Sequence, residues 1–165
     1  GPIALTLPMP LHEYRDGKLP QHLNSHPELD ALLAIWHEKR GERLQPSRSD
    51  FPLEAMTRWA SHMSVATVTP EERFQFRLFG TELVHVYGRD LTGWFLDELT
   101  PHDVWSVIIK HYRQVLATGK PLFAPVSVAN GRWYSEVSRL LLPLSDGDRT
   151  NYIMGADFRR YDTER

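Results

Sequence analysis

The chain of 165 residues contains no cysteine. This absence excludes a disulfide framework, thiolate metal ligands and a cysteine nucleophile. Long apolar runs are also missing, because the longest aliphatic stretch is about residues 140–142 and a membrane span needs ~18 apolar residues. The N-terminus lacks a basic segment followed by an apolar one, the pattern of a secretory signal. The sequence therefore predicts a cytoplasmic protein with no membrane partner.

The chain also lacks an excess of charge of one sign. It has 19 Lys and Arg residues against 21 Asp and Glu residues, a net charge of -2. This balance provides no bulk attraction to polyanions, so we expect no nucleic-acid partner. Apolar residues make up 41% and charged residues 24%, values typical of a globular protein of about one domain.

Two segments precede the strand-rich part of the chain. Residues 1–24 are rich in proline and lack a periodic pattern, which predicts an N-terminal extension. Residues 25–64 form an N-terminal helical flank, with one helix predicted over 27–40 and a second, short helix from Asp50. The first helix carries apolar residues at helical spacing, namely Leu29, Leu32, Leu33 and Trp36.

Residues 65–158 form the core and are followed by a charged tail at 159–165. Phe74, Phe76 and Leu78 alternate with polar residues, which predicts a strand with these three side chains on one face. We expect this strand to pair with the short β-branched segment 65–68 in a hairpin.

Helices and a second hairpin complete the core. A short helix is predicted over 81–87 and a longer one over 101–118. Asn130-Gly131 favours a hairpin with a two-residue loop, in which Val128 opposes Trp133. Runs of strands and runs of helices in this order predict an α+β fold with an antiparallel sheet covered on one face by helices.

Several motifs in this order carry a resemblance to a known family. The segments FQFRLFG at 74–80, GRDLTG at 88–93 and LDEL at 96–99 resemble a PAS domain. Further segments resemble the bacterial stand-alone PAS_5 branch, namely LAIW at 33–36 with RG at 40–41, LQPSR at 44–48 leading into Asp50, and LLLPLSDG at 140–147. The resemblance covers roughly residues 29–158.

The resemblance implies a five-stranded antiparallel sheet with helices on one face and a pocket between them. It implies a non-catalytic sensory or regulatory module, which binds a small molecule or a protein partner and signals in trans. Two alternatives remain open: a ligand-free homodimerisation or scaffold module, and a small-molecule enzyme that uses the same pocket. No catalytic set is legible from the spacing of the residues.

The pocket implied by the resemblance has a defined set of candidate residues. They are Phe74, Phe76, His85, Ile108, His111, Tyr112, Trp133, Arg139 and Met154. Under the dimer alternative, the helix over 27–40 lies outside the sheet unit. Its apolar stripe then forms the interface, because those side chains need cover; the residues are Leu29, Leu32, Leu33 and Trp36.

Arg139 is unusual, because the predicted hairpin register places it on the same face as Val137. A charge on an apolar face is costly unless it is paired. Either a bulge shifts the register so that Leu140, Leu142 and Leu144 face inward, or Arg139 lines the pocket. In the second case it pairs with an acid such as Asp157 or with an anionic ligand.

No cofactor is identified by the sequence. His111 or His85 could ligate a haem iron, although local structural roles for these residues are favoured. A flavin that forms an adduct with a thiol is excluded by the lack of cysteine. His22 and His26 lack a defined coordination set, so we predict no metal site.

Overall fold

The computed structural model describes residues 3–6, 26–130 and 133–159; the side chains of 3–6, 127–130 and 133–135 lie outside this description. An antiparallel sheet with the strand order β1-β5-β6-β7-β2-β3 forms its centre, and β4 pairs with β6. The strands are β1 Ile3–Thr6, β2 Met63–Val68, β3 Phe74–Phe79, β4 Leu122–Phe123, β5 Val126–Asn130, β6 Trp133–Ser145 and β7 Thr150–Arg159. The predicted antiparallel sheet is confirmed, with β1 and β4 as additional strands.

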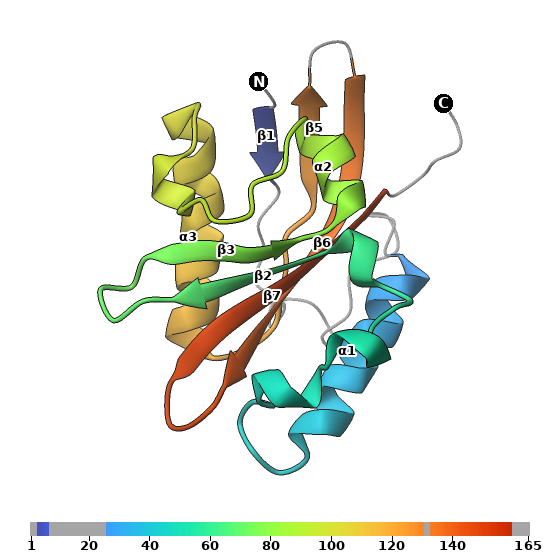
Figure 1. The fold of residues 1–165 in the computed structure, drawn as a ribbon, viewed down its shortest axis with the longest axis vertical. Helices are drawn as coiled ribbons and strands as arrows, with labels where there is room; N and C mark the ends of the chain where they lie inside the picture. The colour runs from blue at the N-terminus through green and yellow to red at the C-terminus, as the bar shows by residue number, and fades with distance from the viewer. Residues whose placement is uncertain (1–2, 7–25, 131–132, 160–165) are drawn as a thin grey trace.

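Helices cover both faces of this sheet (Figure 1). They are α1 Pro27–Arg40, α2 Thr81–Tyr87 and α3 His102–Thr118, with 3-10 turns η4 Arg48–Asp50, η5 Leu53–Ala55, η6 Ala60–His62 and η7 Leu96–Glu98. Leu141 points into a core with α2 and α3, whereas its neighbours Leu140 and Leu142 point into a second core with α1. The predicted N-terminal flanking helix α1 thus covers the second face of the sheet, instead of lying outside the sheet unit.

Local signals explain the ends of α1. His26 is the N-cap, and its Nδ1 accepts a hydrogen bond from the Glu28 amide at 3.1 Å. Gly41 ends the helix at φ 56°, a left-handed value that glycine adopts without a steric penalty. The indole Nε1 of Trp36 donates to the Pro143 carbonyl at 2.9 Å, which ties α1 to β6.

The apolar stripe of α1 is therefore buried against its own sheet. Leu29 and Leu32 are 0% exposed and Trp36 is 2% exposed. Together with Leu33, these side chains pack in the core that contains Leu140 and Leu142. The expectation that they form a dimer surface is corrected, because the sheet of the same chain already provides the cover they need.

Two further expectations about local structure are wrong. The short helix predicted from Asp50 is replaced by the 3-10 turns η4, η5 and η6. Pro52, between the first two turns, lacks the amide hydrogen that a continuous helix requires.

The strand β3 contains a bulge, which lies between the pairs Val65↔Leu78 and Ala66↔Phe76. The bulge sends Leu78 to the α1 face and leaves Phe76 on the α3 face.

The hairpin register also differs from the prediction. Asn130 pairs with Trp133, and Val128 lies opposite Ser135 rather than opposite Trp133. The difference is a shift of two residues along the strand pair. Alternation of apolar and polar residues has the same period of two, so it could not distinguish these registers.

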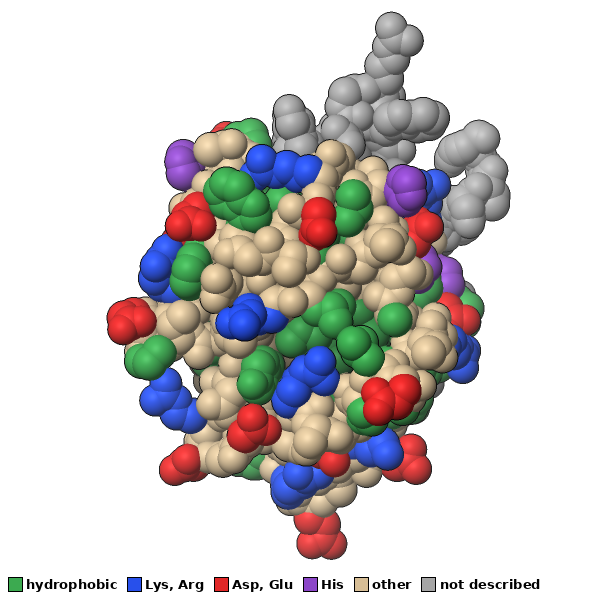
Figure 2. All heavy atoms as spheres, viewed as in Figure 1, with side chains coloured by type: hydrophobic (Ala, Val, Ile, Leu, Met, Phe, Trp, Pro, Cys, Tyr) green, Lys and Arg blue, Asp and Glu red, His purple; other side chains and the backbone are tan. Residues whose placement is uncertain are grey.

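The surface carries charges of both signs. On the face in Figure 2, Lys and Arg side chains are interspersed with Asp and Glu side chains. Among the described residues, no helix is long and apolar enough to cross a membrane.

Candidate functional site

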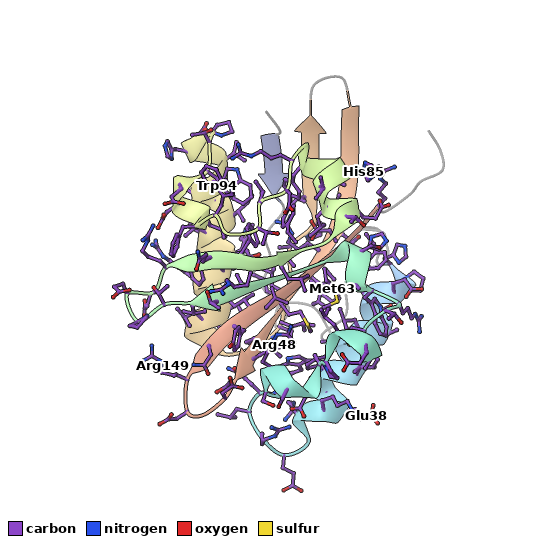
Figure 3. The ribbon with its side chains drawn as sticks, in the orientation of Figure 1. Glu38, Arg48, Met63, His85, Trp94 and Arg149 are labelled. Carbon is purple, nitrogen blue, oxygen red and sulfur yellow. The ribbon has the colours of Figure 1, made fainter. Side chains whose placement is uncertain are left out.

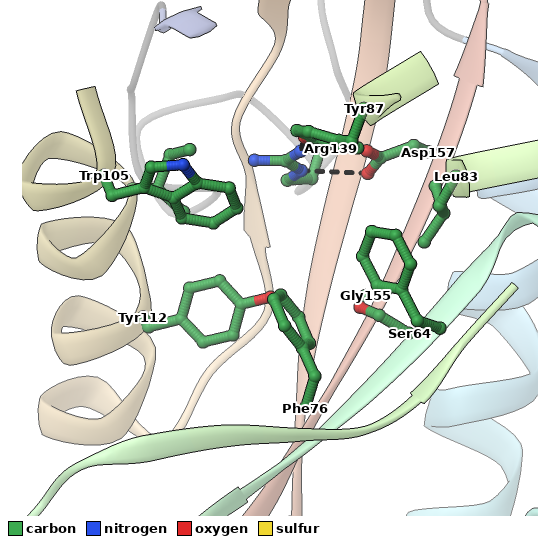
Figure 4. Close-up of a pocket in the computed structure, with 11 residues that line it drawn as sticks. Ser64, Phe76, Leu83, Tyr87, Trp105, Tyr112, Arg139, Gly155 and Asp157 are labelled. Atoms are coloured by element: carbon green, nitrogen blue, oxygen red, sulfur yellow. Dashed lines mark hydrogen bonds and ion pairs between the residues drawn. The ribbon is translucent and has the colours of Figure 1, made fainter. Parts of the chain in front are cut away.

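The interior site lies between the sheet, α2 and α3 (Figure 4). Its lining residues are Ser64, Phe76, Phe79, Leu83, Tyr87, Trp105, Ile108, Tyr112, Arg139, Gly155 and Asp157. The open space between them is only about 10 Å³, which is room for about one water molecule. Large rings from both layers fill the remainder, including Phe76 against Trp105 at a centroid distance of 6.4 Å.

A buried ion pair occupies the sheet side of this interior. Arg139 on β6 and Asp157 on β7 are directly paired in the register of the two strands. The Arg139 Nε and Nη2 atoms donate to the two Asp157 carboxylate oxygens, both at 2.8 Å. Arg139 Nη2 also donates to the Tyr87 hydroxyl on α2. Since Arg139 and Asp157 are 5% and 6% exposed, the pair is largely desolvated, and its contact with Tyr87 links α2 to the sheet.

This geometry resolves the two alternatives for Arg139. The β6–β7 register shifts only between Leu144 and Ser145, so no bulge lies near Arg139. Arg139 faces α3 and pairs with Asp157, as one alternative predicted. The residues Leu140, Leu142 and Leu144 are nevertheless buried, because the opposite face of β6 is covered by α1.

The two tyrosine hydroxyls of the site stay protonated. Burial raises the pKa of Tyr87, with the Arg139 charge opposing this effect. Burial likewise raises the pKa of Tyr112 to about 12, with the Arg139 charge again opposing this effect. Burial is the largest single influence on Arg139 and lowers its pKa, but the charge and hydrogen bonds of Asp157 together with the two tyrosines raise the pKa overall. The interior thus holds one positive and one negative charge that compensate each other.

His111 is buried on α3 but does not line the interior space. It is 3% exposed, and its Nδ1 atom has no hydrogen-bond partner among the residues that the structure describes. Burial, followed by the Arg139 charge, lowers the pKa of this imidazole to about 4. The ring is therefore neutral near pH 7.

The structure brings together part of the predicted pocket. Phe76, Ile108, Tyr112 and Arg139 line the interior space as predicted. Phe74 lies in the same core and contacts Tyr112 at a ring-centroid distance of 5.4 Å, without reaching the open space.

Two other candidates lie elsewhere, and a third falls outside the described side chains. His85 is exposed on the outer side of α2 (Figure 3), because the inner side of this helix is formed by Leu83 and Tyr87. Met154 is buried in the core on the α1 face, since its odd-numbered neighbours on β7 face α3. The side chain of Trp133 lies outside the described part of the structure.

Sequence reasoning missed several lining residues, among them Ser64, Leu83, Tyr87, Trp105 and Gly155. Leu83 and Tyr87 are four residues apart on α2 and therefore share one helical face. That spacing was available in the sequence. Ser64 and Gly155 carried no such signal, because they approach each other only through the pairing of β2 with β7.

The closed interior does not fit a haem or a flavin, because both far exceed about 10 Å³. His111 also lies off the open space. Among the residues that the structure describes, no three His, Asp or Glu side chains gather into a group that could hold a metal ion.

A larger, open groove adjoins the interior site. Its volume is about 310 Å³, and its lining residues are His26, His62, Glu82, Leu83, Val86, Val137, Asp157, Phe158 and Arg159. Leu83 and Asp157 line both spaces, so these two residues form the wall between the groove and the interior.

Phe158 lies between two imidazoles at this groove. Its ring stacks on His62 at 4.0 Å and is tilted against His26 at 4.8 Å between centroids. His62 Nδ1 also lies 3.1 Å from the Asp157 carbonyl oxygen. The N-terminus of α1, η6 and the end of β7 therefore meet at a single aromatic stack.

Comparison with known proteins agrees with this architecture. A family model described as PAS domain, of the PAS_5 branch, matches residues 24–156. The chain belongs to the PAS domain family. The matched region includes α1, the helix that covers the second face of the sheet.

One solved structure found in the comparison is titled as an RNA-binding Light-Oxygen-Voltage receptor. The identity is 20% and the TM-score is 0.44, over 63% of this chain and 31% of that chain. This chain thus spans less than a third of the receptor's length. A comparison with curated proteins returned no match.

Proposed function

We propose that this PAS domain is a non-catalytic sensory or regulatory module that binds a small molecule in the groove beside α2 and signals to a partner protein. The observation that carries the proposal is the contrast between the two spaces. The groove has about 310 Å³ and the interior about 10 Å³, while binding sites for small molecules commonly have about 300–1,000 Å³.

The interior supports a structural role instead. The Arg139 guanidinium is engaged by both Asp157 oxygens and by Tyr87. A ligand there would have to displace buried hydrogen-bonded groups, which is costly because the abandoned partners stay desolvated. We therefore assign ligand binding to the groove and place the predicted interior pocket residues in the core.

The path from the groove to the rest of the molecule runs through α2. Leu83 and Val86 line the groove, whereas Tyr87 on the same short helix accepts a hydrogen bond from Arg139. A ligand that shifts α2 therefore changes the contact between α2 and the buried ion pair. Coupling of about 1–3 kcal/mol is typical of such linked sites.

A non-catalytic role is favoured by the state of the buried acid. Asp157 is the one acidic residue that lines both spaces, and Arg139 holds both of its carboxylate oxygens. A carboxylate held in this way is poorly placed to exchange protons with a substrate. A protein partner, a homodimer and a cytoplasmic location remain predictions.

Nuclear magnetic resonance of the labelled protein tests the proposal. The probes form two series, and each series contains a zwitterion, an anion, a cation and an uncharged amide with the same apolar group. The first series is leucine, 4-methylpentanoate, 3-methylbutylamine and 4-methylpentanamide. The second is phenylalanine, 3-phenylpropanoate, phenethylamine and 3-phenylpropanamide. We expect at least one probe to cause saturable shifts at Leu83, Val86 and Phe158, together with Tyr87.

Substitutions that fill the groove provide the control. Glu82→Trp places a large ring at the groove and should abolish the shifts, whereas Glu38→Trp on α1, far from the groove in Figure 3, should leave them unchanged. Absence of saturable binding by every probe, or binding that survives Glu82→Trp, would overturn the proposal.

A further inference from the structure

The polar groups of the groove differ in whether they already have partners. The Asp157 carboxylate is held by Arg139. His62 Nδ1 contacts the Asp157 carbonyl oxygen, and His26 Nδ1 accepts from the Glu28 amide. Both imidazoles also pack on Phe158. These polar groups already have partners within the fold. They therefore shape the groove but are not available to bind a charged ligand.

Glu82 and Arg159 are the remaining charged residues of the groove. Neither side chain makes a hydrogen bond or an ion pair within 4.0 Å to any residue that the structure describes. Glu82 projects from α2 and Arg159 from the end of β7. The groove therefore carries two opposite charges that are too far apart to neutralise each other directly.

The groove also has an apolar wall. It is formed by the edges of Leu83 and Val86 of α2, Val137 of β6 and Phe158 of β7, whose side chains are otherwise buried. A ligand that covers this surface removes apolar area from water, which favours binding. The groove thus combines one acidic group, one basic group and an apolar wall.

We propose that the groove binds a small zwitterion of the α-amino-acid class with an apolar side chain, an inference that rests on the proposed function. The ligand's ammonium group pairs with Glu82, its carboxylate pairs with Arg159, and its side chain packs on Phe158. The guanidinium of Arg159 can donate two parallel hydrogen bonds to a carboxylate. A ligand with one charge leaves either Glu82 or Arg159 without a partner.

The size of the groove favours a single amino acid over a longer peptide. Its volume of about 310 Å³ is at the lower limit of the range of about 300–1,000 Å³ for small-molecule sites. A zwitterion also adds no net charge, so the groove gains two ion pairs without accumulating charge of one sign.

Titration calorimetry of the whole chain with the leucine series tests this inference. Leucine should bind at least about tenfold more tightly than 4-methylpentanoate, 3-methylbutylamine or 4-methylpentanamide, because each of these lacks one or both ion pairs. Phenylalanine and its analogues should follow the same order.

Two charge-removing variants assign the roles. Glu82→Gln should weaken leucine about tenfold and leave 4-methylpentanoate unchanged, since that acid has no ammonium group. Arg159→Gln should weaken both leucine and the acid, and leave 3-methylbutylamine unchanged. Glu38→Gln and Arg149→Gln, at exposed positions away from the groove (Figure 3), are matched controls and should leave all affinities unchanged.

The outcomes separate this inference from the proposed function. Tightest binding of a singly charged or uncharged probe at the groove would overturn the zwitterion and retain the small-molecule role. Equal effects of Glu82→Gln on leucine and on 4-methylpentanoate would also overturn it. If a leucine-containing dipeptide binds tightly and leucine does not, the groove recognises a peptide, and the proposal of a single amino acid is overturned. Absence of binding by any probe would overturn both proposals.

Discussion

At the scale of single residues, the Arg139–Asp157 pair dominates the interior. Both side chains are nearly inaccessible, and their carboxylate–guanidinium contact is bidentate. The attraction within such a pair is balanced largely by the free energy of desolvating both ions. Its importance is therefore greatest when only one partner is removed.

We expect Arg139→Met to lower the free energy of unfolding by about 3–5 kcal/mol, because it leaves the Asp157 carboxylate buried and uncompensated. The double variant Arg139→Met with Asp157→Leu should recover much of this loss. Urea unfolding followed by circular dichroism measures both. A double variant that is no more stable than the single variant would refute this explanation.

His111 predicts a dependence of stability on pH. Its pKa is lowered by burial to about 4 in the folded chain, against about 6.5 in an unfolded chain. Between these values the unfolded chain binds a proton that the folded chain does not, so stability falls as the pH decreases from about 6.5 to about 4. The contribution is about 1–3 kcal/mol.

Comparison with a variant isolates this contribution from that of other acid-sensitive groups. His111→Leu fills the site without a titratable group and should reduce the loss of stability in this pH window. Urea unfolding at several pH values gives both curves. Parallel curves for the two proteins across the window would show that His111 does not contribute.

At the scale of elements, α2 depends on a close approach at its start. Gly80 is the N-cap of α2, and its amide donates to the Met63 carbonyl at 2.8 Å. A Cβ atom at Gly80 would lie only 2.3 Å from the backbone oxygen of Ser61. Glycine therefore allows β3 to turn into α2 while η6 passes against it.

Gly80→Ala should consequently destabilise the protein by about 1–3 kcal/mol, since backbone must move to relieve the overlap. Gly147→Ala is a matched control, because no atom lies within 4 Å of a Cβ placed there. Thermal unfolding compares the two variants. Equal melting temperatures for Gly80→Ala and the unmodified chain would contradict the close contact.

At the scale of the whole molecule, one sheet supports two cores. Leu141 belongs to the core with α3, and Leu140 and Leu142 belong to the core with α1. Alternate side chains of a strand point to opposite faces. The two cores are thus joined through the backbone of β6, and we expect them to unfold together.

Leu32→Ala tests this coupling. Leu32 is 0% exposed on α1, so its truncation should cost about 2–5 kcal/mol. Native-state hydrogen exchange should show the same loss of protection at Val115 on α3 as at amides of α1. Loss confined to α1 would mean that the cores open separately. Leu53→Ala, at a side chain that is 47% exposed, is a control with little expected effect.

Local patterns in the sequence were sufficient for most of the elements. The spacing of Leu29, Leu32 and Trp36 and the stop at Gly41 predicted α1, and the alternation in 74–78 predicted β3. These signals depend on residues within a few positions of each other, where backbone geometry fixes which side chains share a face. Together with the motifs that resemble a PAS domain, they determined the antiparallel α+β fold.

Only the tertiary structure decided which of the candidate residues meet. Arg139 and Asp157 are adjacent because β6 and β7 pair in one register, and Tyr87 replaces His85 in the site because α2 docks by one particular face. The groove, too, unites Glu82 with Arg159 from elements that are distant in the chain. Register and docking are set by the fit of whole faces across the sheet, and the local sequence around each residue does not contain that information.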